Sequence, residues 1–270
     1  MAQGLKTLVV SGLMLALAGS AFAGDLVVKG STTVLPIAQA AAEAFMKSHT
    51  GVSITISGGG SSEGIKALLD GTTQIANSSR NMKEKELGDA AAKGVQPVEH
   101  KVAMDAIVVM VHPSNPVQDL SLEQLQAIYT GKVSNWKEVG GEDKPMVVVG
   151  RDTSSGTFET WETMVLKKEK VLPGALVVAS SGAMLQTVAK NPYAIGYDGI
   201  GYLNDSVKGV TVGGVRAAKE SALNGSYPIS RFLFMYTNGE PSGDTKAFLD
   251  FVKGAEGQKI VEQVGFVPVQ

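Results

Sequence analysis

Predicted strands and helices alternate along most of this chain, and this alternation limits the possible folds more than any other feature of the sequence. Short apolar runs of strand length are separated by stretches with helical periodicity. The run at residues 106–111 is apolar throughout and rich in β-branched side chains, which is typical of a strand covered on both faces. Strands that alternate with helices indicate parallel βαβ units. We therefore expect an α/β protein.

The individual elements follow from hydrophobic periodicity and from turn residues. Strands are predicted at residues 26–29, 52–57, 74–77, 106–111, 146–149, 194–197 and 229–237. Helices are predicted at residues 37–47, 63–69, 83–93, 122–129, 157–168, 183–190, 245–252 and 257–264.

Two turn-rich segments divide this series into two sets. Pro113 and Pro116 favour a turn or linker after the strand at 106–111, and Asn224-Gly225-Ser226 forms the second turn signal. The sequence therefore predicts a first lobe of residues 24–111 plus 227–270 and a second lobe of residues 112–226. Each lobe is expected to be a mostly parallel sheet flanked by helices, with the last segment rejoining the first lobe.

The N-terminus has the pattern of a secretory signal peptide. Lys6 supplies the positive charge, residues 8–18 are largely apolar, and Ala21 and Ala23 fit the small-residue cleavage pattern. The apolar run is shorter than the ~20 residues that a membrane span needs, although a retained anchor is the alternative interpretation. We expect cleavage after Ala23 and a periplasmic protein.

Composition excludes several classes of function. The chain carries 24 basic and 26 acidic side chains, and loss of residues 1–23 removes only Lys6, so the net charge moves from -2 to -3. A slightly acidic chain argues against a nucleic-acid partner. The absence of cysteine excludes disulfides, Cys-ligated zinc and cysteine nucleophiles. The histidines His49, His100 and His112 have no metal-ligand spacing, and no cofactor is implied.

Three loops are rich in glycine and hydroxyl side chains, and each lies between a predicted strand and a predicted helix. They are residues 30–33, 58–64 and 150–157, and the third contains Arg151. A helix N-terminus presents free N–H groups and partial positive charge, glycine allows close approach, and hydroxyls add donors. Such loops bind anions. The alternative interpretation is plain helix capping, which needs only one hydroxyl per helix.

Two other functions use glycine-rich loops of this kind. A P-loop needs lysine directly after its last glycine, but Ile65 follows Gly64 and Lys66 comes one residue later. Residues 60–64 match the G-x-S-x-G pattern of a serine hydrolase, with Ser62 as nucleophile. That fold places its histidine near the C-terminus, where this chain has none.

In these loops the sequence resembles the periplasmic phosphate-binding proteins of high-affinity phosphate importers, in their shorter form. The resemblance covers most of the mature chain. Its motifs are Gly30-Ser31-Thr32 with Leu35-Pro36, Gly60-Ser61-Ser62-Glu63-Gly64, Ile75-Ala76-Asn77-Ser78-Ser79-Arg80, Arg151 with Ser154-Ser155-Gly156-Thr157, Ile128-Tyr129-Thr130-Gly131 with Asn135-Trp136, and Ala194-Ile195-Gly196-Tyr197.

The resemblance implies the two-lobed type II periplasmic-binding-protein fold, with the ligand in the interlobe cleft. It also implies a monomer without catalytic activity that captures phosphate and delivers it to the permease of an ABC importer. Hinge closure of the lobes would accompany capture. The implied phosphate-binding residues are Thr32, Thr33, Ser61, Ser62, Ser79, Arg80, Arg151, Ser155, Gly156 and Thr157.

One position departs from the family pattern. Better-known, longer members have an aspartate where this chain has Ser79, and that aspartate accepts the proton of hydrogen phosphate. Arg80 could add positive charge or be a surface arginine, and Asp105 and Asp152 are possible substitute acceptors, Asp152 alternatively orienting Arg151. Selectivity against sulfate or molybdate is therefore open, and a binding protein for one of these oxyanions is the nearest alternative.

Overall fold

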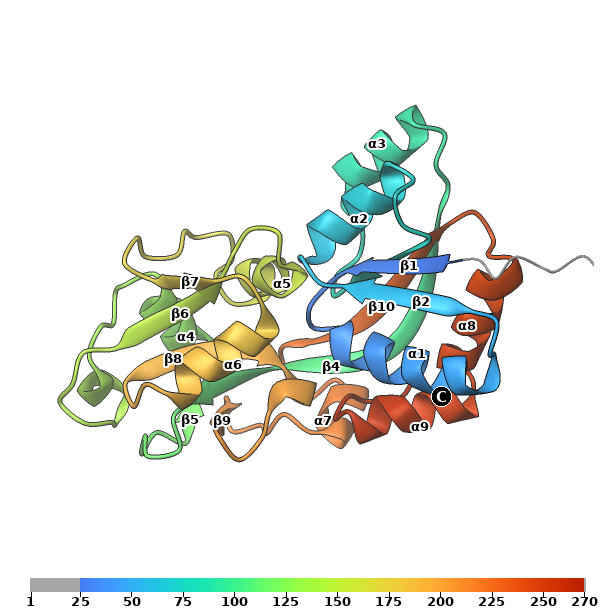
Figure 1. Ribbon diagram of the computed structural model, residues 1–270. Helices are drawn as coiled ribbons and strands as arrows, with labels where there is room; N and C mark the ends of the chain where they lie inside the picture. Colours follow the sequence, from blue (N-terminus) through green and yellow to red (C-terminus); the bar gives the residue numbers. More distant parts are fainter. Residues whose placement is uncertain (1–24, 270) are drawn as a thin grey trace, which may run out of the picture.

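The computed structural model describes residues 25–269, so the predicted signal peptide at residues 1–23 lies outside the described residues. Within the described range, no helix combines the length and apolar character needed to cross a membrane. The chain forms a mixed α/β structure in which two groups of elements lie on either side of a long strand, β4 (Figure 1). The predicted α/β class is confirmed.

The first lobe contains the N-terminal elements and the C-terminal helices. Strand β1 pairs in parallel with β2 on one side and with β3 on the other. Helices α1, α8 and α9 pack against one another and help to close its core. The elements are β1 (Asp25–Gly30), α1 (Leu35–Ser48), β2 (Ser53–Ser57), α2 (Ser61–Leu69), β3 (Ile75–Ser78), α3 (Glu84–Ala92), α8 (Gly243–Lys253) and α9 (Ala255–Gln263).

The second lobe is built around strand β6, which pairs in parallel with β7 and β8. Its core includes an aromatic cluster in which Trp161 stacks on Tyr197 at 4.0 Å between ring centroids, with Tyr129 edge-on to both. The elements are β5 (Asp119–Leu120), α4 (Leu122–Tyr129), η1 (Trp136–Val139), β6 (Val147–Arg151), α5 (Gly156–Met164), β7 (Leu176–Val178), α6 (Ser181–Ala189), β8 (Ala194–Gly199), η2 (Ile200–Tyr202), β9 (Lys208–Val212) and α7 (Lys219–Leu223).

Strands β4 (Pro97–Val111) and β10 (Ser230–Asn238) connect the lobes. The first part of β4 pairs with β10, from Pro97 opposite Asn238 to Ala106 opposite Ser230. Residues 107–111 of the same strand pair instead with β8 and β9. One continuous strand therefore contributes to the sheets of both lobes.

The expected mostly parallel sheets are only partly observed. The outer strands pair in parallel, but β4 and β10 run antiparallel to every strand with which they pair. The reason is topological: β10 brings the chain back from the second lobe and therefore enters the sheet of the first lobe in the opposite direction. The residues 107–111 that the sequence assigned to the first lobe belong by packing to the core of the second.

Candidate functional site

The three hydroxyl-rich loops meet where the two lobes face each other. Each loop directly follows a strand, β1, β2 or β6, and the second and third lead into the N-termini of α2 and α5. Gly30 illustrates the close packing, because a Cβ atom there would lie 2.2 Å from the carbonyl oxygen of Asn77 and its φ is +133°. Only glycine fits this backbone without strain. Two contacts join the second and third loops across the lobes: Ser62 N donates to Ser154 O at 3.1 Å, and Ser154 Oγ lies within hydrogen-bond distance of Gly59 O, at 2.9 Å.

Arg151, at the end of β6, is the centre of the polar cluster. It is buried, and its Nη2 donates to Thr32 Oγ1 of the first lobe at 2.9 Å. Its Nη1 donates to Asp198 Oδ2 at 2.9 Å and to Ser181 Oγ at 3.1 Å. Its Nε is buried with no hydrogen-bond partner among residues 25–269. Arg151 therefore links both lobes and keeps one donor unused.

A second contact between the lobes joins two threonines. Thr33 Oγ1 and Thr157 Oγ1 are 2.8 Å apart, and both residues are at most 1% exposed. Thr157 Oγ1 also accepts a hydrogen bond from Arg231 Nη2 at 2.9 Å. Arg231 is in turn bound to Asp105. Burial raises the pKa of Asp105 to about 6, while Arg231 acts in the opposite direction.

The third part of the site lies between α2 and α5. Ser79 N donates to Ser61 Oγ at 3.0 Å, and the two hydroxyl oxygens are 3.3 Å apart. Gly156, the first residue of α5, lies directly against them, because a Cβ atom there would be 2.3 Å from Ser61 Oγ and 2.7 Å from Ser79 Oγ. The structure thus brings together most of the predicted residues: Thr32, Thr33, Ser61, Ser79, Arg151, Ser155, Gly156 and Thr157.

Part of the third loop serves as a helix cap, as the alternative interpretation held. Ser155 Oγ accepts from Phe158 N at 3.2 Å, and Ser155 N donates to Asp152 O at 3.1 Å. Asp152 accepts from Ser154, through both the backbone N–H and the hydroxyl. The suggested orientation of Arg151 by Asp152 is not observed, because Asp198 pairs with Arg151 instead.

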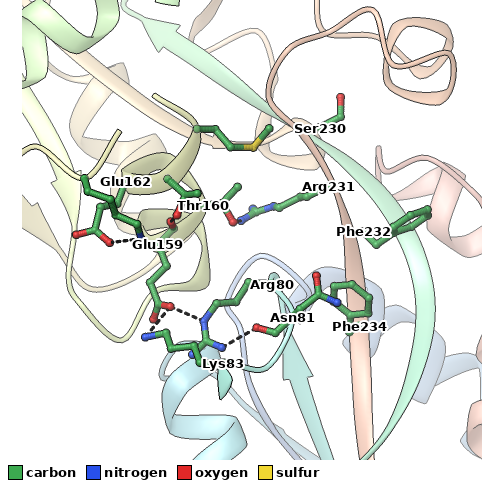
Figure 2. A pocket seen from close by; sticks show the side chains of 13 residues that line it. Arg80, Asn81, Lys83, Glu159, Thr160, Glu162, Ser230, Arg231, Phe232 and Phe234 are labelled. Carbon is green, nitrogen blue, oxygen red and sulfur yellow. Dashed lines mark hydrogen bonds and ion pairs between the residues drawn. The ribbon is translucent and has the colours of Figure 1, made fainter. Parts of the chain in front are cut away.

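Arg80 and Ser62 have other partners. Arg80 forms two hydrogen bonds with Glu86, both at 2.8 Å, and its Nε lies 2.6 Å from Glu159 Oε2 on α5 without the geometry of a hydrogen bond. Ser62 Oγ donates to Glu159 at 3.1 Å and accepts from Arg80 at 3.0 Å. Lys83 Nζ is 2.8 Å from Glu159 Oε2 (Figure 2). We call Arg80, Lys83 and Glu159 the charged clasp, since it joins the lobes beside the hydroxyl cluster.

Arg80 of the clasp is electrostatically matched to its other acidic partner, Glu86. Burial by itself would lower the pKa of Arg80, but its contacts with Glu86 and Glu159 outweigh burial and raise it. Burial by itself would raise the pKa of Glu86, but hydrogen bonding to Arg80 holds it below its ordinary value. Both partners are therefore charged near neutral pH.

The sequence prediction missed several residues of the cluster. Ser181 opens α6 in a Ser-Ser-Gly segment with the same chemistry as the third loop, which was a usable signal. Asp198 directly follows a predicted strand, but an acidic residue at the end of a strand is a weaker signal of a binding site. Arg231 is a buried arginine inside an apolar strand, and Glu159 is one of several acids on its helix. Only the fold brings these last two to the site.

The arrangement lacks the parts of a serine hydrolase. The hydrogen bonds of Ser62 run to Glu159, Arg80 and Ser154. The three histidines are engaged elsewhere: His49 with Phe45 and Ser48, His100 with Thr237, and His112 with Ser114. Across residues 25–269 no cluster of acidic or histidine side chains could hold a metal ion. The buried donors of the cluster suit binding of an anion with many acceptor oxygens.

Comparisons with known proteins agree with this chemistry. A family model described as a PBP superfamily domain matches residues 17–256. The phosphate-binding protein PstS of Bacillus subtilis is 37% identical over 248 residues, which covers 91% of this chain and 81% of that protein.

Two solved structures are also similar. A Clostridium perfringens structure with bound phosphate, assigned as a phosphate ABC transporter substrate-binding protein, is 38% identical, with a TM-score of 0.86 and coverage of 92% of this chain and 100% of that chain. An ABC-type phosphate transport receptor from Vibrio cholerae is 31% identical, with a TM-score of 0.73 and coverage of 90% and 99%. The two-lobed binding-protein fold is thereby confirmed, and the chain belongs to the PBP superfamily and, within it, to the PstS family of substrate-binding proteins.

Proposed function

We propose that this protein captures inorganic phosphate between its lobes and delivers it to the permease of an ABC importer. The observation that carries the proposal is the buried cluster in which Arg151 and Thr157 of the second lobe meet Thr32 and Thr33 of the first. A guanidinium group and hydroxyls can donate to several oxygens of a tetrahedral oxyanion at once. The names of the relatives, and the phosphate bound in one of the similar structures, support phosphate as that oxyanion.

The proposed contacts are the donors that converge on the cluster, and the remaining predicted residues act at its edge. Ser62 and Arg80 are assigned to closure of the lobes rather than to contact with phosphate, because Ser62 donates a hydrogen bond to Glu159 and Arg80 forms an ion pair with it. Direct contacts are proposed for Thr32, Thr33, Ser61, Ser79, Arg151, Gly156 and Thr157, with Ser155 holding the start of α5.

Capture involves no chemical step, and closure occurs about the two connections between the lobes. We place the boundary at Ala106–Ile107 rather than after residue 111, because residues 107–111 pair with β8 and β9. The second connection is the segment before β10, where Ile107 N donates to Ile229 O at 2.8 Å. These two adjacent backbone segments are the proposed hinge.

Titration calorimetry of the mature protein with phosphate, sulfate and molybdate tests the function. Phosphate is expected to bind at least tenfold more tightly than the others. Arg151→Ala should weaken binding by about 10- to 100-fold, because a buried charged donor is lost. Arg151→Lys should recover only part of the lost affinity, since an ammonium group cannot reproduce the paired donors of a guanidinium group. Tighter binding of sulfate or molybdate would reassign the ligand, and no binding of any of the three would refute the proposal.

We also propose that the protein is exported and works in the periplasm as a monomer without a cofactor. The support is the signal-peptide pattern, with cleavage expected after Ala23. Mass spectrometry of the protein from a periplasmic fraction should give a chain that begins at Gly24. Intact residues 1–23 on membrane-bound protein would contradict this. Light scattering of the mature protein checks the monomeric state.

A further inference from the structure

Arg231 lies on β10, beside the hydroxyl cluster, and is held in one orientation. Its Nε and Nη2 donate to Asp105 Oδ2 at 3.0 and 2.9 Å. The other oxygen of Asp105 accepts from Ile200 N at 2.9 Å, so the carboxylate is fixed as well. Figure 2 shows the Arg231 side chain extending from β10 toward Thr160 of α5. Both charged partners are buried, and they lie on the two strands that connect the lobes.

The contact between Arg231 and Thr157 fixes the direction of a hydrogen bond. A guanidinium group can only donate, so Thr157 Oγ1 is the acceptor of the 2.9 Å bond from Arg231 Nη2. The single proton of the Thr157 hydroxyl is then available to another acceptor. The neighbouring hydroxyl oxygen is that of Thr33, at 2.8 Å across the lobes. Arg231 thus leaves the Thr157 proton free to point toward the cluster.

A second contact holds the same turn of α5. Arg231 Nη1 donates to Thr160 Oγ1 at 3.4 Å, and Thr160 Oγ1 donates to the carbonyl of Gly156 at 3.0 Å. Arg231 therefore touches the first turn of α5 at two positions, three residues apart on one helix face. This turn carries Gly156 and Thr157, both of which we assign to the ligand.

We propose that Arg231 is a positioning residue for anion binding, which acts through the Thr157 hydroxyl. From a strand that connects the lobes, it keeps this hydroxyl oriented as a donor toward the ligand. The proposal rests on the proposed function, because it needs an oxyanion that accepts from Thr157. The unprotonated oxygens of an oxyanion need donors, and a hydroxyl that is free to rotate can present an oxygen lone pair instead.

The competing explanation is purely structural: Arg231 would serve only as the counterion of Asp105. Loss of one partner of a buried ion pair destabilises a protein whether or not a ligand is present. The two explanations differ in what happens when the Thr157 hydroxyl is absent. If Arg231 acts through this hydroxyl, substituting Arg231 in a chain that already lacks the hydroxyl causes no further loss of phosphate affinity.

A double-mutant cycle on phosphate affinity makes this test. The variants of the mature chain are Arg231→Lys, Thr157→Val and both together, measured by titration calorimetry with inorganic phosphate. Lysine can still pair with Asp105 but cannot keep the forked geometry. Each single substitution is expected to weaken phosphate binding by about tenfold, and the double variant by no more than about twofold beyond Thr157→Val. Thr163→Val is the matched control, because the Thr163 hydroxyl also donates to a backbone carbonyl of α5, that of Glu159, at 2.9 Å; it should stay within about threefold of the wild type.

Folding is checked by thermal unfolding without ligand. If Arg231→Lys is unfolded, the pair Arg231→Gln with Asp105→Asn replaces it in the cycle, because it removes both charges together. Additive losses of affinity, or unchanged affinity in the Arg231 variants, would overturn the positioning role while leaving phosphate binding intact. If the wild type itself binds no oxyanion, the proposed function fails, and this inference fails with it.

Discussion

Gly156 occupies a tight point between the two lobes. A methyl group at this position would lie within 3.0 Å of the Ser61 side chain, and the nearest atom would be only 2.3 Å away. Gly156 is also the first residue of α5, so its backbone is part of the proposed anion site. Even the methyl side chain of alanine therefore does not fit the closed arrangement seen here.

Gly156→Ala is accordingly expected to weaken phosphate binding by at least about tenfold, because the lobes must separate by some tenths of an ångström or more and lose contacts to the ligand. Titration calorimetry measures the effect. Gly182→Ala, at the start of α6, is the matched control, since nothing lies within 4 Å of its Cβ position. Equal affinity for the two variants would show that phosphate does not need the closed contact at Gly156.

Charge at the site is balanced by pairs of residues. Arg151 pairs with Asp198, and Arg231 pairs with Asp105, and the acid of each pair is fully buried. An anion in this cluster would therefore be held mainly by oriented donors rather than by excess positive charge. Ser79 keeps this balance, whereas an aspartate there would add an unpaired negative charge.

Ser79→Asp should therefore change selectivity. The added carboxylate can accept a proton from dihydrogen phosphate but repels sulfate, which carries no proton near neutral pH. We expect phosphate binding to persist, mainly below the second phosphate pKa near 6–7, and sulfate binding to weaken further. Competitive calorimetry across about one pH unit on either side of that value measures this. Loss of phosphate binding at every pH, with Ser79→Ala unaffected, would mean that position 79 does not face the ligand's proton.

At the scale of elements, α5 combines two roles. Its first turn carries Gly156 and Thr157, and Glu159 on the same helix receives Arg80 and Lys83 from the first lobe. In the proposed function, the start of α5 therefore contacts the ligand, and the residues that follow join the lobes. This arrangement couples the presence of ligand at one end of the helix to the charged clasp beside it.

Glu159→Gln should leave the fold intact and increase the rate of phosphate release by about tenfold, because the clasp loses its charge while Ser62 keeps an acceptor. Stopped-flow fluorescence provides the rate, since Trp161 lies in the same helix. Glu162→Gln is the control, because Glu162 pairs with Lys168 within the second lobe. Identical release rates in both variants would exclude the clasp from closure.

The elements also show how far the sequence alone can lead. Residues 106–111 were predicted as a strand because they are apolar, but the preceding part of β4 contains Glu99, Lys101 and Asp105 and carries no such signal. Its strand conformation comes from pairing with β10, a contact between distant segments. The predicted helix at 157–168 ends earlier, at Met164, and positive φ values follow at Lys167 and Lys168.

Residues of the site, like the elements, could be predicted only where a local sequence pattern marks them. The loops that carry Thr32, Ser61 and Arg151 have local signals, namely glycine, hydroxyls and the start of a helix. Asp198 and Arg231 act through position, and their contacts with Arg151 and Thr157 depend on how the lobes pack. Local patterns therefore identified the donors but not the acids and arginine that orient them.

At the scale of the whole molecule, two cores are joined by β4 and by the segment before β10. Ile200 and Tyr202 of the second lobe pack against the first core, and the other contacts between the lobes include the polar hydroxyl cluster and the charged clasp. Such contacts contribute little net stability in the absence of ligand, because the same groups can bind water when the lobes separate. A ligand bound by both lobes adds the missing connection.

Phosphate should therefore stabilise the protein as one cooperative unit. A ligand at 100 times its dissociation constant stabilises the folded state by about 2.7 kcal/mol, which for a chain of this size corresponds to a rise in Tm of roughly 5–10 °C. Calorimetric unfolding of the mature protein with and without phosphate measures the shift. Arg151→Ala at the same phosphate concentration is expected to show little of it, because the bridging donor is lost. An equal shift in Arg151→Ala, or in wild type with the same concentration of sulfate, would indicate a general ion effect instead of capture between the lobes.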